Sequence, residues 1–343
     1  MLRTVDFESI ESCLDGYVIV DVRSPKEYAQ SAIAQAVNIP LFSDDERVEV
    51  GTLYKREGRN AAVKAGVDYV SRSLPQIYGQ FAALSAERKK FLIYCARGGM
   101  RSDAVGAFLS SIGFPVTKLA LGYKGYRKHI VRRLPELIAG ITAVTLYGKT
   151  GVGKTAILHL IKGMGYDIVD LEGCAGHRGS ILGAIGFSCE HSQKQFETHL
   201  YNSLKNAKSD LIFMEGESKR IGNVYVPDLL MEKMAAGRKL LIEADIKTRK
   251  EIIRKEYVGT DFDKLSVLPP LEKLTRYVGK EKVAEYKTLI ETEKYDTVIE
   301  ELMLKYYDNV YNTSKEKFEQ SFFCVEPKLT ATEIIEYIVQ RAC

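Results

Sequence analysis

The sequence lacks several features that would have placed it in a special class of proteins. It has no uninterrupted apolar run near the ~18 residues that a membrane-spanning helix needs. Its early acidic residues do not fit a signal peptide. No internal repeat or low-complexity segment is visible. None of the six cysteines forms a Cys-x-x-Cys pair, so a disulfide framework and a structural zinc site are both disfavoured. We therefore expect a protein of the reducing cytoplasm that does not enter a membrane.

Length and composition indicate a globular protein of two domains. The 343 residues exceed the ~250–300 at which a single hydrophobic core stops growing. Hydrophobic residues make up 45% and charged residues 27%, which excludes disordered, collagen-like and coiled-coil proteins. The net charge of +4 fits a polyanionic partner and an ordinary soluble protein equally well.

Short apolar runs alternate with helical stretches, which predicts an α/β fold with mostly parallel sheets. We assign residues 1–130 to a first domain, 131–140 to a linker and 141–343 to a second domain. Within the second domain, the charged stretch 247–320 is expected to be mostly helical. The predicted strands are 17–20, 36–40, 91–94, 116–119, 142–147, 167–169, 210–214 and 239–243.

The first predicted chemical site is Cys95, which follows a strand and precedes a loop with two glycines and two arginines. Backbone N–H groups of such a loop can point at the sulfur, and the helix that follows adds positive potential. Because these effects lower the pKa of a thiol, and the thiolate is the nucleophile, we predict a reactive cysteine. Ser102 is a candidate cap of the helix. The residues assigned to an anion cradle are Arg97, Gly98, Gly99 and Arg101.

Two chemistries fit this loop. Cys95 and Arg101 have the Cys-x5-Arg spacing of protein phosphatases, whereas the cysteine of a rhodanese loop carries a persulfide or a related chalcogen. Tyr94 stands where tyrosine phosphatases usually have His. The segment 21–28 resembles the DxR-x-x-x-E-[YF] element of rhodanese domains, and 121–126 resembles the glycine-containing segment after their last strand. We therefore favour a rhodanese-like domain, and we interpret the Asp and Arg of the first segment as a structural ion pair.

The second predicted chemical site is a phosphate-binding loop. Residues 148–155 read Gly-Lys-Thr-Gly-Val-Gly-Lys-Thr, between a predicted strand and an apolar helix. This context is typical of G-x-x-x-x-G-K-[ST] loops, whose backbone N–H groups cradle phosphates. The pattern predicts phosphate or diphosphate binding without naming the ligand. The residues assigned to the site are Gly148, Gly151, Gly153, Lys154 and Thr155, with Thr155 as a Mg²⁺ ligand if a metal is used.

Further polar residues follow other predicted strands of the second domain, at the sheet edge where ligands of open α/β sheets bind. No base-recognition motif of GTPases is present, which weakens a plain nucleotide-hydrolysis interpretation. Cys174 has no flanking pair of cations, so a structural role is favoured for it. The candidate ligand contacts are Asp170, His177, Arg178, Glu215 and Glu217. Asp170 and Glu215 are also candidate metal ligands.

A rhodanese loop followed by a P-loop in one chain resembles the tRNA 2-selenouridine synthase family. The resemblance implies a rhodanese-like domain joined to a P-loop NTPase-like, parallel-sheet domain with a helical extension. It covers nearly the whole chain and rests on residues 21–28, 50–55, 95–102, 122–124, 148–155, 170–173, 177–180, 215–218 and 221–222.

This resemblance implies an enzyme that replaces the sulfur of wobble 2-thiouridine in tRNA with selenium from selenophosphate, by way of S-geranylation from geranyl diphosphate. Cys95 would then be the selenium-carrying nucleophile, and the P-loop would hold the diphosphate leaving group. No tightly bound cofactor is implied, and Mg²⁺ is a candidate ion. A selenophosphate-producing enzyme is a candidate partner.

Reaching a base in an anticodon loop requires contacts to RNA. Basic residues within 247–255 are considered too, although a solvated helix face is the slightly preferred interpretation there. The candidate tRNA contacts are Lys124, Arg127, Lys128, Arg132, Arg133, Lys219 and Arg220.

The residues leave three other functions open. The first is a rhodanese-type sulfurtransferase with a regulatory nucleotide-binding P-loop domain. The second is a Cys-x5-Arg phosphatase fused to a kinase-like module, and the third is a non-enzymatic, nucleotide-gated binding protein. Mass spectrometry of tRNA nucleosides after incubation with selenophosphate and geranyl diphosphate would separate them.

Overall fold

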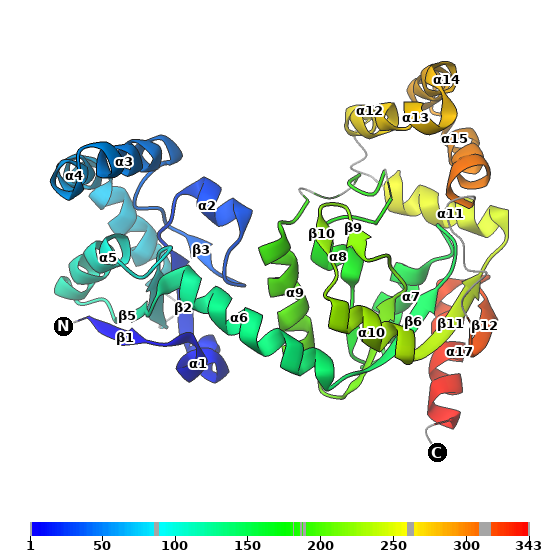
Figure 1. Ribbon diagram of the computed structural model, residues 1–343, viewed down its shortest axis with the longest axis horizontal. Helices are drawn as coiled ribbons and strands as arrows, with labels where there is room; N and C mark the ends of the chain where they lie inside the picture. The colour runs from blue at the N-terminus through cyan, green and yellow to red at the C-terminus, as the bar shows by residue number, and fades with distance from the viewer. Residues whose placement is uncertain are drawn as a thin grey trace. The chain divides into compact units, whose positions relative to one another are not determined.

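The computed structural model describes residues 2–85, 89–180, 182–185, 187, 190–258, 264–308 and 317–341, with the side chains of 264–266 left out. The chain forms two compact units, Met1–Arg133 and Leu134–Cys343. Each contains a five-stranded parallel sheet flanked by helices (Figure 1), which confirms the predicted α/β class. None of the helices in the described part of the chain has the length and apolar character needed to cross a membrane.

The first unit is built on a sheet in the order β1-β5-β4-β2-β3, so that β4 lies in the centre. Its central strands are apolar and buried on both faces, as parallel sheets between helices require. The strands are β1 (Arg3–Val5), β2 (Tyr17–Asp21), β3 (Val37–Asn38), β4 (Lys90–Tyr94) and β5 (Val116–Leu119). The helices are α1 (Phe7–Ile10), η1 (Glu11–Gly16), α2 (Pro25–Gln30), α3 (Asp44–Arg56), α4 (Arg59–Leu84), α5 (Met100–Ser111) and α6 (Gly122–Ala139).

The residues 131–140, predicted as a linker, lie mostly in helix α6. Ile130, Leu134 and Ile138 are buried at four-residue spacing, so one apolar stripe runs across the predicted boundary. The helix therefore continues through Pro135 and ends at Ala139. The connection between the two units is helical rather than irregular.

The second unit has the sheet order β12-β11-β6-β8-β7, with β6 in the centre, and a small antiparallel pair β9–β10. Its core packs strand and helix side chains such as Leu146, Ile157, Phe213 and Ile242. The strands are β6 (Thr142–Tyr147), β7 (Ile168–Val169), β8 (Leu211–Glu215), β9 (Arg220–Ile221), β10 (Val224–Tyr225), β11 (Arg238–Glu243) and β12 (Gln320–Phe323). Helices of the sheet region are α7 (Lys154–Gly163), α8 (Leu171–Ala175), α9 (Gln193–Lys205), α10 (Asp228–Ala236) and α17 (Pro327–Gln340).

A group of short helices forms a separate part of the second unit, next to α11 (Figure 1). It has a hydrophobic cluster of its own, which includes Leu271, Leu274 and Tyr286. The predicted helical character of 247–320 is thus seen in the described residues, while 259–263 and 309–316 lie outside them. The helices are α11 (Ile246–Tyr257), α12 (Lys264–Lys273), α13 (Thr275–Val278), α14 (Lys280–Glu291), α15 (Tyr295–Leu302) and η3 (Met303–Tyr307).

Candidate functional site

Cys95 lies directly after the central strand β4 and is only 3% exposed. Its Sγ is 3.3 Å from the hydroxyl of Ser102, which also lies 3.0 Å from the carbonyl oxygen of Gly99. Ser102 is inside α5, whose N-cap is Gly99, so the expectation that Ser102 caps this helix is wrong. The serine faces the thiol instead, because the first turn of α5 wraps around the sulfur.

The surroundings of Cys95 favour its thiolate. Burial raises the pKa of the thiol, but hydrogen bonds from the Ser102 hydroxyl and from the backbone of Arg97 and Ser102 lower it. The charge of Arg101 adds to this, and the net pKa lies below the ordinary value for cysteine. Arg97 acts here through its backbone, since its side chain is exposed.

The first turn of α6 completes the cysteine loop. The N–H groups of Tyr123 and Lys124 donate to the carbonyl oxygens of Cys95 and Ala96, at 2.9 and 3.0 Å. Gly122 has φ +54, and a Cβ there would lie 2.1 Å from the Cys95 oxygen. Gly98 has φ +65, and a Cβ there would clash with the backbone of residues 121 and 122. The glycine-containing segment 121–126 therefore closes the cradle around Cys95.

Arg101 is held by Glu27, whose Oε2 lies 2.6 Å from the Arg101 Nη1. Burial raises the pKa of Glu27, but the hydrogen bond and charge of Arg101 outweigh it and lower the pKa. Glu27 is the third residue of α2 and also closes a capping box with Ser24. No spacing in the sequence pointed to its contact with Arg101.

Asp21 and Arg23 form the predicted structural ion pair. Both side chains are at most 5% exposed, and Arg23 Nη2 lies 2.6 Å from Asp21 Oδ2. The same guanidinium nitrogen donates to the carbonyl of Ser31. The pair therefore fixes the turn between β2 and α2.

The P-loop follows β6, the central strand of the second sheet. Gly148, Gly151 and Gly153 have φ of +151, +81 and +88. A Cβ at Gly148 would lie 2.3 Å from the Ile242 oxygen, and one at Gly151 would lie 2.6 Å from Ile253. The Lys154 ammonium donates to the Gly148 carbonyl at 2.8 Å. The loop curls as a phosphate cradle requires, with its lysine folded over it.

A cluster of carboxyl groups lies beside the P-loop. Thr155 donates to Glu172 Oε2 at 3.2 Å, and the Leu171 N–H donates to Glu215 Oε2 at 3.0 Å. The other Glu215 oxygen is buried and has no hydrogen-bond partner among the described residues. Burial and the neighbouring acids raise the pKa of Glu215 well above its usual value and that of Glu217 to about 8. At neutral pH part of this cluster therefore carries protons.

Glu172 is a site residue that the sequence interpretation missed. It was part of the segment 170–173 that supported the family resemblance, but it received no role. Burial raises its pKa, whereas the charge of Lys154 and the Thr155 hydrogen bond lower it. Asp170, one of the candidate residues from the pattern, uses its carboxylate on the Gly173 N–H and on His159.

His177 and Arg178 are enclosed rather than open to a ligand. His177 Nδ1 accepts the Gly179 N–H at 3.0 Å, and burial lowers its pKa, so the ring is neutral at pH 7. The Arg178 guanidinium lies 4.8 Å from the ring centres of both Phe187 and Tyr257. Its charge acts on Glu172 without a direct ion pair.

Cys174 has the structural character expected from its sequence surroundings. It is buried at 5% exposure. Burial and the charges of Asp170 and Glu215 raise the pKa of the thiol. A thiol in this state is neutral and inert at physiological pH.

The P-loop is anchored from the helical part of the second unit. Arg249 is buried, donates to the Thr150 carbonyl at 2.9 Å and pairs with Asp308 at 2.7 Å. Lys149 pairs with the same carboxylate at 3.1 Å. The basic segment 247–255 is thus largely committed to internal contacts, because Lys250 and Arg254 also pair with acids.

The other basic residues differ in their surroundings. Lys124 and Lys128 are exposed on α6, whereas Arg127 is half-buried. Arg132 pairs with Glu8 at 2.7 Å, and Lys219 pairs with Asp228. The Arg220 Nε donates to the Gly222 carbonyl at 2.8 Å.

Both units match known family models. Residues 9–129 match the rhodanese-like domain, and residues 141–342 match the AAA domain of tRNA 2-selenouridine synthase. The chain belongs to the tRNA 2-selenouridine synthase family.

Curated members of this family align with most of the chain. The tRNA 2-selenouridine synthase of Hydrogenovibrio crunogenus is 36% identical over 264 residues, which cover 74% of this chain and 71% of the relative. That of Sulfurovum sp. is 33% identical, covering 76% and 71%. That of Marinobacter nauticus is 29% identical over 329 residues, covering 87% and 88%. The match of residues 9–129 agrees with the rhodanese-like domain expected around the Cys95 loop.

Proposed function

We propose that this protein is a tRNA 2-selenouridine synthase, which replaces the sulfur of wobble 2-thiouridine with selenium. The observation that carries the proposal is the state of Cys95. Its thiol is held at the end of a central strand, with a lowered pKa, inside a loop of backbone N–H groups and cations. Such a thiolate can attack the phosphorus of selenophosphate: a sulfur–phosphorus bond forms, and the phosphorus–selenium bond breaks with its electron pair going to selenium. The selenide released then attacks carbon 2 of the uridine, and water cleaves the sulfur–phosphorus bond to give phosphate and the free thiol.

Selenophosphate is the proposed selenium donor because the Cys95 loop is a site for an anion. Gly98 lets the loop pack closely against residues 121 and 122, Gly99 faces open space, and α5 adds the potential of its N-terminus. Glu27 holds Arg101 in place, while the exposed Arg97 is free to adjust toward an oxyanion. Cys95 is the proposed nucleophile that releases selenide from selenophosphate, and Arg97, Gly98, Gly99 and Arg101 form the proposed cradle of the anion.

The P-loop is proposed to bind the diphosphate of geranyl diphosphate. The thiouridine sulfur attacks carbon 1 of the geranyl group, and the carbon–oxygen bond breaks with its electron pair going to the diphosphate. The uridine ring then loses its N3 proton. Lys154 and the N–H groups of the loop stabilise the charge that develops on the leaving group. The S-geranyl sulfur is the better leaving group when selenium later attacks carbon 2.

Mg²⁺ fits the donor set beside the P-loop. The described residues contain no group of three or more His, Cys, Asp or Glu side chains placed to hold a metal. Mg²⁺ bound through one or two protein oxygens and the phosphates of a substrate needs no such group. Thr155 and Glu172, whose oxygens lie 3.2 Å apart, are the proposed ligands. The ion would neutralise charge on the diphosphate.

The tRNA is proposed to contact α6 near the cysteine loop. Lys124 donates its backbone N–H to the loop, and its side chain is exposed together with that of Lys128. Two exposed cations so close to Cys95 would guide the phosphates that flank the modified base.

The test is mass spectrometry of nucleosides from 2-thiouridine tRNA incubated with the enzyme. With geranyl diphosphate alone, S-geranyl-2-thiouridine should accumulate, and adding selenophosphate should convert it to 2-selenouridine. Lys154→Ala should lower geranylation about 100-fold, the usual scale for one lost charge-stabilising donor. Lys162→Ala, at an exposed position of the same helix, is the control. Unchanged tRNA together with turnover of thiosulfate would instead support the sulfurtransferase with a regulatory P-loop.

A further inference from the structure

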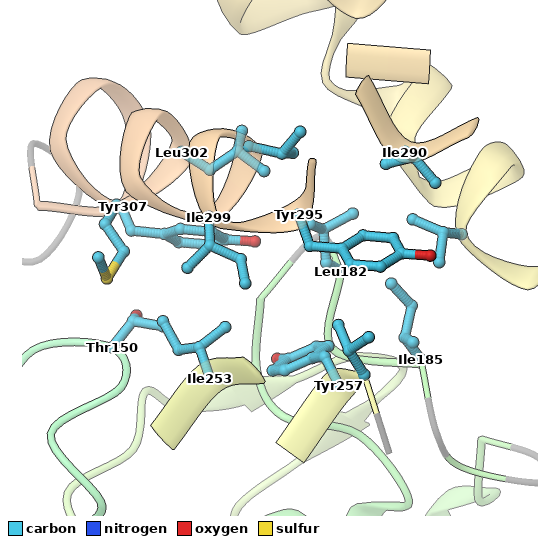
Figure 2. A pocket seen from close by; sticks show the side chains of 14 residues that line it. Thr150, Leu182, Ile185, Ile253, Tyr257, Ile290, Tyr295, Ile299, Leu302 and Tyr307 are labelled. Carbon is cyan, nitrogen blue, oxygen red and sulfur yellow. The ribbon is translucent and has the colours of Figure 1, made fainter. Parts of the chain in front are cut away.

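An apolar cavity of about 80 Å³ lies in the second unit, between the P-loop and the helical part. Since about 10–15 Å³ of such space is enough for one water molecule, the cavity has room for several methylene groups. Side chains from α11, α14 and α15 surround it together with two residues of the segment 182–185 (Figure 2). Thr150 of the P-loop is part of its lining.

The lining of the cavity carries no charged side chain. Isoleucine, leucine, valine and methionine make up most of it, and three tyrosines and Thr150 supply its polar groups. One of these tyrosines, Tyr307, has its hydroxyl 3.4 Å from the Ser180 hydroxyl. A nucleobase or a ribose would leave its polar groups unpaired here. A hydrocarbon chain has no polar groups that could be left unpaired in this cavity.

The cavity adjoins the phosphate-binding loop. Ile253 lines the cavity, and the same side chain packs against Gly151 of the P-loop. The Thr150 carbonyl that faces α11 is held by Arg249. Figure 2 shows Thr150 and Tyr307 at one side of the cavity, with Ile185 and Ile290 at the opposite side. A ligand whose head lies on the P-loop can therefore extend its tail across the cavity.

We propose that this cavity binds the hydrocarbon chain of the allylic diphosphate whose head occupies the P-loop. This inference rests on the proposed function, and it adds a site for the part of the substrate that the P-loop cannot recognise. Ile185 and Ile290 stand at the end of the path from Thr150, so they limit the length of chain that fits.

The test fills the cavity with a larger side chain and measures the binding of two ligands. Ile299 projects from α15 into the cavity (Figure 2) and is partly buried, so Ile299→Trp reduces the space. Binding of geranyl diphosphate should weaken by roughly 30-fold or more, since each displaced CH₂ costs about fourfold in affinity. Binding of inorganic pyrophosphate should change less than about twofold, because its site is the P-loop.

The matched control is Thr297→Trp, at an exposed position of the same helix. The natural chain has no tryptophan, so the emission of the introduced residue reports its surroundings. Blue-shifted emission in Ile299→Trp, but not in the control, shows a folded protein with a filled cavity. If Ile299→Trp does not fold, Ile299→Asn serves instead, because a polar amide should repel the hydrocarbon and leave pyrophosphate binding intact.

The outcomes separate the inference from the function beneath it. If the wild-type enzyme geranylates tRNA and the filled variant binds geranyl diphosphate as well as the control does, the cavity inference is wrong and the function stands. If the wild-type enzyme binds pyrophosphate but not geranyl diphosphate, both are wrong. Selective loss of geranyl diphosphate binding in the filled variant supports the inference.

Discussion

The Cys95 loop and the P-loop are built alike but surrounded differently. Each follows the central strand of a five-stranded parallel sheet, leads into a helix and contains at least one glycine with positive φ. Each also has a nearby Arg–carboxylate pair, Arg101 with Glu27 and Arg249 with Asp308. The same backbone arrangement, an anion cradle at the carboxyl edge of a sheet, thus occurs twice in one chain.

The difference lies in what each loop offers to a ligand. The first holds a thiol whose pKa is lowered, so it can act as a nucleophile. The second has no thiol and lies beside carboxyl groups whose pKa values are raised, so it is suited to binding a leaving group and a metal. The comparison assigns covalent chemistry to one loop and electrostatic stabilisation to the other.

The largest expected effect comes from removing the nucleophile of the Cys95 loop. Cys95→Ser should lower selenium incorporation into tRNA by at least about a thousand-fold, because removing a nucleophile costs catalysis on that scale. Geranylation should persist. Nucleoside mass spectrometry measures both products, with Cys13→Ser, at an exposed cysteine of the same unit, as the control. If selenation survives in Cys95→Ser, Cys95 is not the nucleophile, and the covalent chemistry assigned to its loop is wrong.

The next effect concerns the anchoring of the second loop. Asp308→Ala leaves the Arg249 guanidinium, which is 4% exposed, without its carboxylate. Breaking such a buried pair should lower the free energy of unfolding by about 3 kcal/mol, measured by urea denaturation. Asp296→Ala, which removes the partner of the exposed Arg254, should cost at most about 1 kcal/mol. Equal effects of the two changes would show that the P-loop does not depend on this pair.

Ser102→Ala tests whether the Ser102 hydroxyl stabilises the thiolate of Cys95. Without the hydroxyl, the pKa of Cys95 should rise by about one unit, the value of one lost hydrogen bond to a charged group. The rate of alkylation by iodoacetamide should then reach its midpoint at a higher pH, and at pH 7 it should fall roughly tenfold. Ser111→Ala removes a similar hydroxyl three residues after its acceptor, but on an exposed site, and should leave the profile unchanged.

The smallest expected effect tests whether the tRNA contacts the exposed lysines of α6. Lys128→Ala should weaken tRNA binding several-fold and reduce the slope of log affinity against log salt concentration by about one. Lys64→Ala, at an exposed position on α4, is the control. An unchanged slope would place the RNA contacts away from this part of α6.

The sequence predicted the features that depend on local pattern. The glycine-containing loops and the central strands follow from motif spacing and apolar runs, and the structure has both. The edge strands β1 and β12 were not predicted. They are three and four residues long and carry polar side chains, so only their neighbours in the sheet define them.

Contacts between distant residues could not be predicted in this way. Glu27 reaches Arg101, and Asp308 reaches Arg249, across long stretches of sequence without any spacing rule. Glu172 was visible in a loop after a strand, but its position beside Thr155 depends on how α8 packs near the P-loop. A partner of this kind emerges from the fold and not from the motif.

The most direct test of two separate chemistries is a staged assay with the two inactivated enzymes. Cys95→Ser is incubated with 2-thiouridine tRNA and geranyl diphosphate, and the recovered tRNA is given to Lys154→Ala with selenophosphate. The account predicts S-geranyl-2-thiouridine after the first stage and 2-selenouridine after the second, although neither variant makes 2-selenouridine efficiently from 2-thiouridine alone. Failure of Lys154→Ala to selenate the geranylated tRNA, with its fold intact, would contradict the division of labour between the two loops.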